Sequence, residues 1–138
     1  RSQYVKTRKN AIYLDAYNAN PSSVAPALED FAQLNVENKH VILADMLELG
    51  AISTNEHQRI LHLLKELNME NVLLIGKAYG QFKGYGDFQY FETKDEAERF
   101  LTANPIEHAT VFLKGSRSFK LESLMDLPSS IVLCLWIR

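Results

Sequence analysis

Short apolar runs alternate with stretches of helical periodicity along most of the chain. A continuous apolar run of about four to eight residues is typical of a strand that is covered on both faces. The pattern predicts such strands at residues 11–14, 40–44, 72–76 and 110–113. Alternation at residues 2–7 and a short aromatic run at 88–91 predict two further strands.

The segments between these strands carry apolar residues at steps of three and four, the spacing that gives a helix one buried face. This periodicity predicts helices at residues 22–34, 54–67, 95–101 and 119–125. Ser53 and Glu56 have the spacing of a capping box, which places the start of the second helix near Thr54. The glycine-rich residues 77–87 predict one helical turn followed by a loop.

Strands and helices that alternate in this way predict a fold in the α/β class. The expected architecture is a Rossmann-like, doubly wound, mostly parallel sheet of about six strands, with helices on both faces and right-handed crossovers. We expect residues 1–128 to form one domain and residues 129–138 to form an apolar tail.

Polar clusters follow three of the predicted strands, at residues 15–20, 45–48 and 114–117. The carboxyl ends of parallel strands lie along one edge of a sheet, so these clusters are expected to converge there. A carboxylate can accept the hydroxyls of a ribose, and amides can donate to phosphate oxygens. A Lys and an Arg can hold a carboxylate or a phosphate. Ordinary turn chemistry and helix capping are the alternative explanation of the same residues.

Three segments resemble motifs of the Mur ligase family. Asp15-Ala16-Tyr17-Asn18-Ala19-Asn20-Pro21 resembles the opening motif of the C-terminal domain in that family. Asp45-Met46-Leu47-Glu48-Leu49-Gly50, with His57 downstream, and Lys114-Gly115-Ser116-Arg117 resemble two later motifs in the same order. Within the family, these forms are most similar to the members that add D-alanyl-D-alanine to UDP-N-acetylmuramoyl-tripeptide. The resemblance runs from Arg1 to about Leu127.

The resemblance implies two sets of binding residues. Contact with ATP is implied for the residues at the start of the chain and in the first cluster: Arg1, Asp15, Tyr17, Asn18 and Asn20. Contact with the acceptor dipeptide is implied for the later clusters: Asp45, Glu48, His57, Lys114, Ser116 and Arg117. Ala44 departs from the family, in which a glycine commonly precedes this Asp.

The resemblance also implies a reaction that this chain does not complete alone. In the family, ATP phosphorylates the tripeptide carboxylate to an acyl phosphate, which the amine of D-Ala-D-Ala then attacks. ATP and Mg2+ are held mainly by a central domain, and the UDP-sugar by an N-terminal domain. We therefore expect no catalytic residue and no metal ligand in this chain, and we expect the isolated fragment to be inactive.

The charge and the cysteine content of the chain limit its binding partners and its cellular compartment. The net charge of −2 argues against nucleic acid or an anionic membrane, which select basic surfaces. Its one cysteine, Cys134, excludes an internal disulfide framework, so we expect a cytoplasmic protein. The chain has no initiating Met and no signal peptide, so we expect a fragment of a longer protein.

Two alternatives remain open on the sequence. One is a stand-alone Rossmann-like binding module without catalysis. The other is a Mur ligase whose acceptor is an amino acid instead of a dipeptide.

Overall fold

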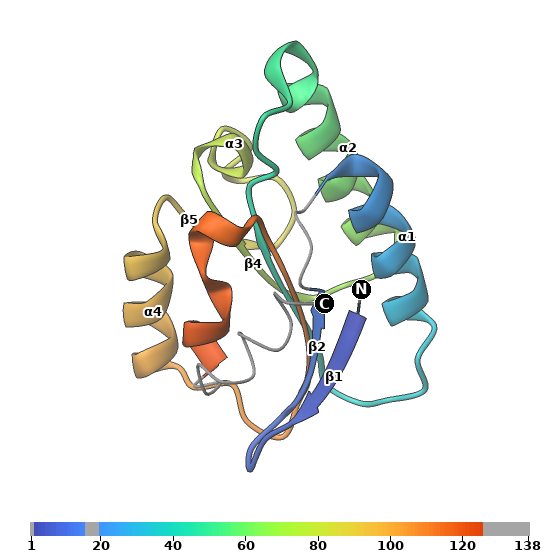
Figure 1. Ribbon diagram of the computed structural model, residues 1–138, viewed down its shortest axis with the longest axis vertical. Helices are drawn as coiled ribbons and strands as arrows, with labels where there is room; N and C mark the ends of the chain where they lie inside the picture. Colours follow the sequence, from blue (N-terminus) through green and yellow to red (C-terminus); the bar gives the residue numbers. More distant parts are fainter. Residues whose placement is uncertain (1, 16–19, 126–138) are drawn as a thin grey trace.

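A six-stranded sheet with helices on both faces forms the body of the molecule (Figure 1). The computed structural model describes residues 2–15 and 20–125, without the side chains of residues 2, 3, 14, 15, 117 and 122. In sheet order the strands are β1 (Ser2–Lys6), β2 (Ala11–Asp15), β6 (Thr110–Lys114), β3 (Lys39–Ala44), β4 (Asn71–Ile75) and β5 (Gln89–Phe91). Strand β1 is antiparallel to β2, and the remaining neighbours are parallel. The predicted mostly parallel α/β sheet is confirmed.

Helices cover the two faces of the sheet unequally (Figure 1). They are α1 (Pro21–Ala32), α2 (Ser53–Glu66), α3 (Lys77–Gly80) and α4 (Lys94–Ala103), with the 3-10 turns η1 (Gly50–Ile52), η2 (Arg117–Phe119) and η3 (Leu121–Met125). Helices α1 and α2 cover one face, and α4 with η3 covers the other. The chain runs outward from β2 to β5 and returns through α4, so β6 lies between β2 and β3.

Strands β3, β4 and β6 are buried on both faces, which explains why their sequences read as continuous apolar runs. Alternate residues divide between two cores. Val41, Leu43 and Phe112 pack toward α1 and α2. Ile42 and Leu113 pack toward α4. Each fully buried side chain of this size contributes about 1.5 to 3 kcal/mol. The buried strands are therefore held firmly in place, and they fix the positions at which the loops begin.

Two local predictions were wrong. Helix α2 begins at Ser53 with Ile52 as its N-cap, and no side chain caps it. The capping box is not formed because η1 leads directly into the helix, and Glu56 pairs instead with Arg59 at 2.8 Å. The helix predicted at 119–125 is two 3-10 turns, separated at Lys120, whose φ is 49°. The predicted tail, residues 129–138, lies outside the described residues.

Candidate functional site

Three of the candidate segments meet at the carboxyl ends of neighbouring strands. In the register of the sheet, Lys114 at the end of β6 pairs with Asp15 at the end of β2 and with Leu43 near the end of β3. We call the strand ends and the segments that follow them, Asp15, Lys114–Ser116 and Asp45–Leu49, the rim. The predicted convergence of the polar clusters is thus confirmed for the backbone of these segments.

The segment assigned to ATP is described only in part. Asn20 is the N-cap of α1, where its Oδ1 accepts from the backbone N–H of Ser23 at 3.1 Å and from the Ser22 hydroxyl at 2.6 Å. The capping explanation therefore accounts for its oxygen, while the predicted amide contact with phosphate stays a prediction. Arg1, Tyr17 and Asn18 lie outside the described residues, and Asp15 is described by its backbone alone.

The segment after β6 places a cation and a hydroxyl at the centre of the rim. Lys114 is 1% exposed and lies on the same side of β6 as Phe112, toward α1 and α2. Ser116 is also buried, and its Oγ lies 2.9 Å from the Oγ of Ser118. Arg117 opens η2. A buried ammonium group at a strand end can act on an anion over a short, poorly screened distance.

Gly115 lets β6, β3 and η3 approach closely. A Cβ built on Gly115 would lie 2.7 Å from Cδ1 of Leu121 and 2.8 Å from the Cβ of Ala44. Real Cβ atoms do not come so near to other heavy atoms, so the position requires glycine as the backbone stands. Ala44 is thus part of the packing that sets the centre of the rim.

Asp45 caps a helix. Its Oδ2 accepts from the N–H of Ala78 at 2.8 Å, and its Oδ1 accepts from the N–H of Tyr79 at 3.0 Å, both in α3. Its own N–H donates to the carbonyl of Ile75 at 3.0 Å. The side chain is 9% exposed. Asp45 therefore joins β3 to α3, and direct contact with an acceptor does not fit this arrangement.

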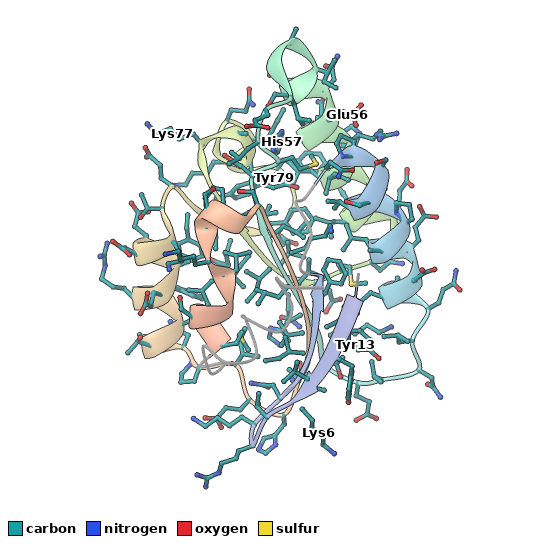
Figure 2. All side chains as sticks on the ribbon, in the orientation of Figure 1. Lys6, Tyr13, Glu56, His57, Lys77 and Tyr79 are labelled. Atoms are coloured by element: carbon teal, nitrogen blue, oxygen red, sulfur yellow. The ribbon has the colours of Figure 1, made fainter. Side chains whose placement is uncertain are left out.

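His57 is buried completely in α2, beside Tyr79 of α3 (Figure 2). Its Nδ1 lies 2.7 Å from the carbonyl of Ser53, and its Nε2 accepts from the N–H of Met46 at 2.9 Å. Both ring nitrogens are used inside the domain, so the prediction that His57 contacts the acceptor does not fit this arrangement either. The ring instead joins α2 to the loop after β3.

Glu48 is the charged residue of this loop that reaches solvent, beside Leu47, which is 44% exposed. It is exposed and has a φ of 62°, in the left-handed region that non-glycine residues seldom adopt. Met46, two residues earlier, is 2% exposed and anchors the loop in the core. Glu48 can therefore present a carboxylate at the rim, and its predicted contact with an ammonium group stays a prediction.

Two residues that support the site were not singled out from the sequence. Gly76 follows β4 with a φ of 124°, and a Cβ there would fall on the Asp45 carboxylate. Burial raises the pKa of Tyr79, and the nearby Asp45 carboxylate raises it further, so the phenol stays neutral. A glycine directly after a buried strand was the available signal, but its partner is far away in sequence.

A hollow of about 360 Å3 lies one strand away from the rim, between α3 and β5. Gly76, Lys77, Lys83, Glu92 and Glu96 are among its lining residues.

Among the residues that the structure describes, no three His, Cys, Asp or Glu side chains gather as a metal site requires. Within the same ranges, no helix is long and apolar enough to cross a bilayer.

A family model and individual relatives both match this chain, and both point to the same family. Residues 1–117 match the family model described as "Mur ligase, glutamate ligase domain". The chain is 30% identical over 142 residues to the UDP-N-acetylmuramoyl-tripeptide–D-alanyl-D-alanine ligase of Bacillus subtilis, a match that covers 94% of this chain and 31% of that protein.

Solved structures of MurF have the same fold as this chain. The structure of MurF from Acinetobacter baumannii aligns with a TM-score of 0.74 at 26% identity, over 95% of this chain and 30% of that one. MurF from Thermotoga maritima, in complex with ADP, aligns with a TM-score of 0.68 at 17% identity over 94% of this chain, and so shows the fold alone. The chain spans 30% to 31% of the length of the Acinetobacter and Bacillus proteins.

Proposed function

The chain belongs to the Mur ligase family and corresponds to the C-terminal domain of its members. From this we propose that the chain is the C-terminal domain of a ligase that adds D-alanyl-D-alanine to UDP-N-acetylmuramoyl-tripeptide. In this proposal the domain binds the acceptor dipeptide and closes over ATP. The other domains of the enzyme hold the UDP-sugar, most of the ATP and Mg2+. The proposed setting is the cytoplasm.

The observation that carries the proposal is the position of β6. Because β6 lies between β2 and β3, the segments that resemble three separate family motifs share one rim. The names of the relatives support the dipeptide as the acceptor.

The proposed roles follow from charge. Asp15, Tyr17, Asn18 and Asn20 contact ATP, with Arg1 reaching toward it. Lys114, Ser116 and Arg117 bind the carboxylate of the dipeptide, and Glu48 binds its ammonium group before reaction. The amine, once deprotonated, attacks the acyl carbon of the acyl phosphate. A C–N bond forms, the C–O bond to phosphate breaks, phosphate leaves with the electron pair, and the nitrogen gives its extra proton to solvent as the amide forms.

The test uses Lys114→Met in the full-length ligase, because methionine preserves most of the buried volume and removes the charge. We expect kcat/KM for D-Ala-D-Ala to fall roughly 30- to 100-fold, or about 2 to 3 kcal/mol, the value of a hydrogen bond to a charged group. Circular dichroism should show an unchanged fold. Lys9→Met is the matched control, because Lys9 is exposed and lies in the turn between β1 and β2, away from the rim.

Normal turnover of Lys114→Met and of Asp15→Ala would remove the site assignment. The family model carries the description "glutamate ligase domain", which favours one alternative, a ligase with an amino-acid acceptor. A panel of D-Ala-D-Ala, D-glutamate and other single amino acids, assayed with the full-length protein, decides between them. Turnover with a single amino acid and none with D-Ala-D-Ala would overturn the proposed acceptor.

A further inference from the structure

We propose that His57 and Asp45 are positioning residues, which hold the loop Asp45–Leu49 so that Glu48 faces the acceptor. This inference rests on the proposed function for its kinetic test, but its structural test does not. The residues concerned belong to three elements: the loop after β3, helix α2 and the short helix α3.

His57 fixes the start of the loop. The carbonyl of Ser53, at 2.7 Å, can only accept, so Nδ1 must carry a proton. The N–H of Met46, at 2.9 Å, can only donate, so Nε2 must be unprotonated. The ring is therefore the neutral Nδ1–H tautomer, assigned from its partners. Since the side chain is 0% exposed, water cannot replace the bond to Met46 if the ring is removed.

Asp45 fixes the same loop from the other side. Its two carboxylate oxygens receive the N–H groups of Ala78 and Tyr79, while its backbone N–H bonds to Ile75. Its Oδ1 also lies 3.9 Å from Nε2 of His57. Adjacent residues of the loop, Asp45 and Met46, are thus tied to separate helices, which leaves this part of the backbone little freedom.

Glu48 benefits from this anchoring. Its left-handed backbone costs on the order of 1 kcal/mol for a residue with a Cβ, and such a conformation persists only where its surroundings enforce it. Here the buried Met46 lies two residues before it and η1 begins two residues after it. A loop held at both ends presents an exposed carboxylate in one place, which reduces the cost of ordering it when a substrate binds.

The kinetic test compares three variants in the full-length ligase. His57→Leu removes the acceptor for the Met46 N–H and should raise KM for D-Ala-D-Ala about tenfold, with KM for ATP unchanged within about twofold. His57→Gln can accept the same N–H through its side-chain oxygen and should restore most of the affinity. His62→Gln should match wild type, because His62 is an exposed histidine of the same helix that contacts Tyr85, away from the loop.

A double-mutant cycle covers the case in which His57→Leu does not fold. Glu48→Gln alone and Asp45→Asn alone, the second of which weakens the bonds to the N–H groups of Ala78 and Tyr79, should each raise KM for the dipeptide, and the double variant should raise it little beyond the larger single effect. Equal increases in KM for both substrates, or a fall in apparent kcat that follows the fraction of folded protein while KM for the dipeptide is unchanged, would show a merely structural role and overturn the proposal. An unchanged KM for the dipeptide in folded His57→Leu, or in Glu48→Gln, would overturn it as well.

A measurement without turnover separates this proposal from the proposed function. In protein labelled with 15N-histidine, the His57 ring should give the nitrogen shifts of the Nδ1–H tautomer. Hydrogen exchange at the Met46 amide should accelerate at least tenfold in His57→Leu and stay slow in His57→Gln. Equal protection in all three proteins would overturn the anchoring even if ligation is confirmed, and accelerated exchange would support it even if the acceptor is a different one.

Discussion

At the scale of single residues, the environment of Gly76 shows how one backbone conformation supports the site. Its φ of 124° is one that residues with a Cβ rarely adopt, and the space that a Cβ would need holds the carboxylate of Asp45. The glycine thus permits the Asp45 side chain to cap α3. Any side chain here would have to displace that carboxylate and strain the backbone.

Gly76→Ala should therefore lower the free energy of unfolding by about 2 to 4 kcal/mol, from backbone strain and loss of the cap. Gly80→Ala is the matched control, because a Cβ on Gly80 meets nothing within 4 Å and its φ lies outside the left-handed range. Urea denaturation measures both. Equal stability of the two variants would contradict the role given to Gly76.

His40 should make stability depend on pH. Partial burial lowers its pKa from the usual 6.5, so the folded state binds this proton less readily than the unfolded state. The stability that neutral His40 contributes is complete above the unfolded pKa and is lost as the pH falls below it and through the lower folded pKa. We expect the wild-type urea midpoint to drop more than that of His40→Gln between roughly pH 7.5 and pH 5.5. Parallel pH profiles would show that His40 does not titrate on unfolding.

The sequence predicted which segments meet at the rim better than it predicted what their side chains contact. Asp45 and His57 stand in a motif, and from the sequence alone both were assigned to the acceptor. In the structure Asp45 accepts from backbone N–H groups 33 and 34 residues away, and His57 contacts a backbone N–H 11 residues away and a carbonyl four residues away. Backbone donors leave no signature in a sequence, so a buried anchor and a ligand contact look the same there.

At the scale of elements, helix α1 combines a structural and a proposed functional role at its first turn. Asn20 and Ser23 form a reciprocal capping box, and Pro21 occupies the first position of the helix. The sequence assigned Asn20 to ATP through the family resemblance and left helix capping as the alternative explanation of its cluster. The two roles use different atoms of Asn20, the oxygen for the cap and the amide nitrogen for phosphate, so they can be separated.

Asn20→Ala should cost about 1 kcal/mol of stability, whereas Asn20→Ser should cost much less, because a serine hydroxyl also caps well. If the amide donates to ATP, both variants should raise KM for ATP about five- to tenfold. Thermal denaturation and steady-state kinetics on the full-length ligase measure the two effects. A normal KM for ATP in Asn20→Ser would reduce Asn20 to a cap.

The predictions for the other elements failed where neighbours decided the outcome. The capping box at Ser53 and Glu56 had the correct spacing, but a 3-10 turn already occupied the position before it. The buried strands were predicted well, because continuous apolar runs follow directly from burial on both faces. Strand β1 is antiparallel to β2 because the turn at residues 7–10 reverses the chain. The alternating pattern predicted a strand here but did not specify its direction.

At the scale of the whole molecule, the packing of Gly115 against Ala44 and Leu121 joins the two central strands of the rim to η3. Gly115→Ala should lower stability by about 1 to 3 kcal/mol, the usual cost of overpacking. Adding Ala44→Gly should recover part of that loss, since it removes one of the two clashing carbons. Urea denaturation of the single and double variants gives the coupling energy, and strict additivity would contradict this packing.

Strand β1 has a consequence for the motion of such a domain. Because β1 is antiparallel to β2, Ser2 pairs with Asp15 and the first residue of β1 lies at the rim. In a ligase of the proposed kind, a rotation of this domain about the start of β1 would move Asp15 least. The loop after β3 lies three strand spacings from β1, roughly 14 Å, so a swing of about 30° would carry Glu48 through roughly 7 Å. The segment proposed to contact ATP would then stay near the axis of the rotation, and the segment proposed to contact the acceptor would move farthest.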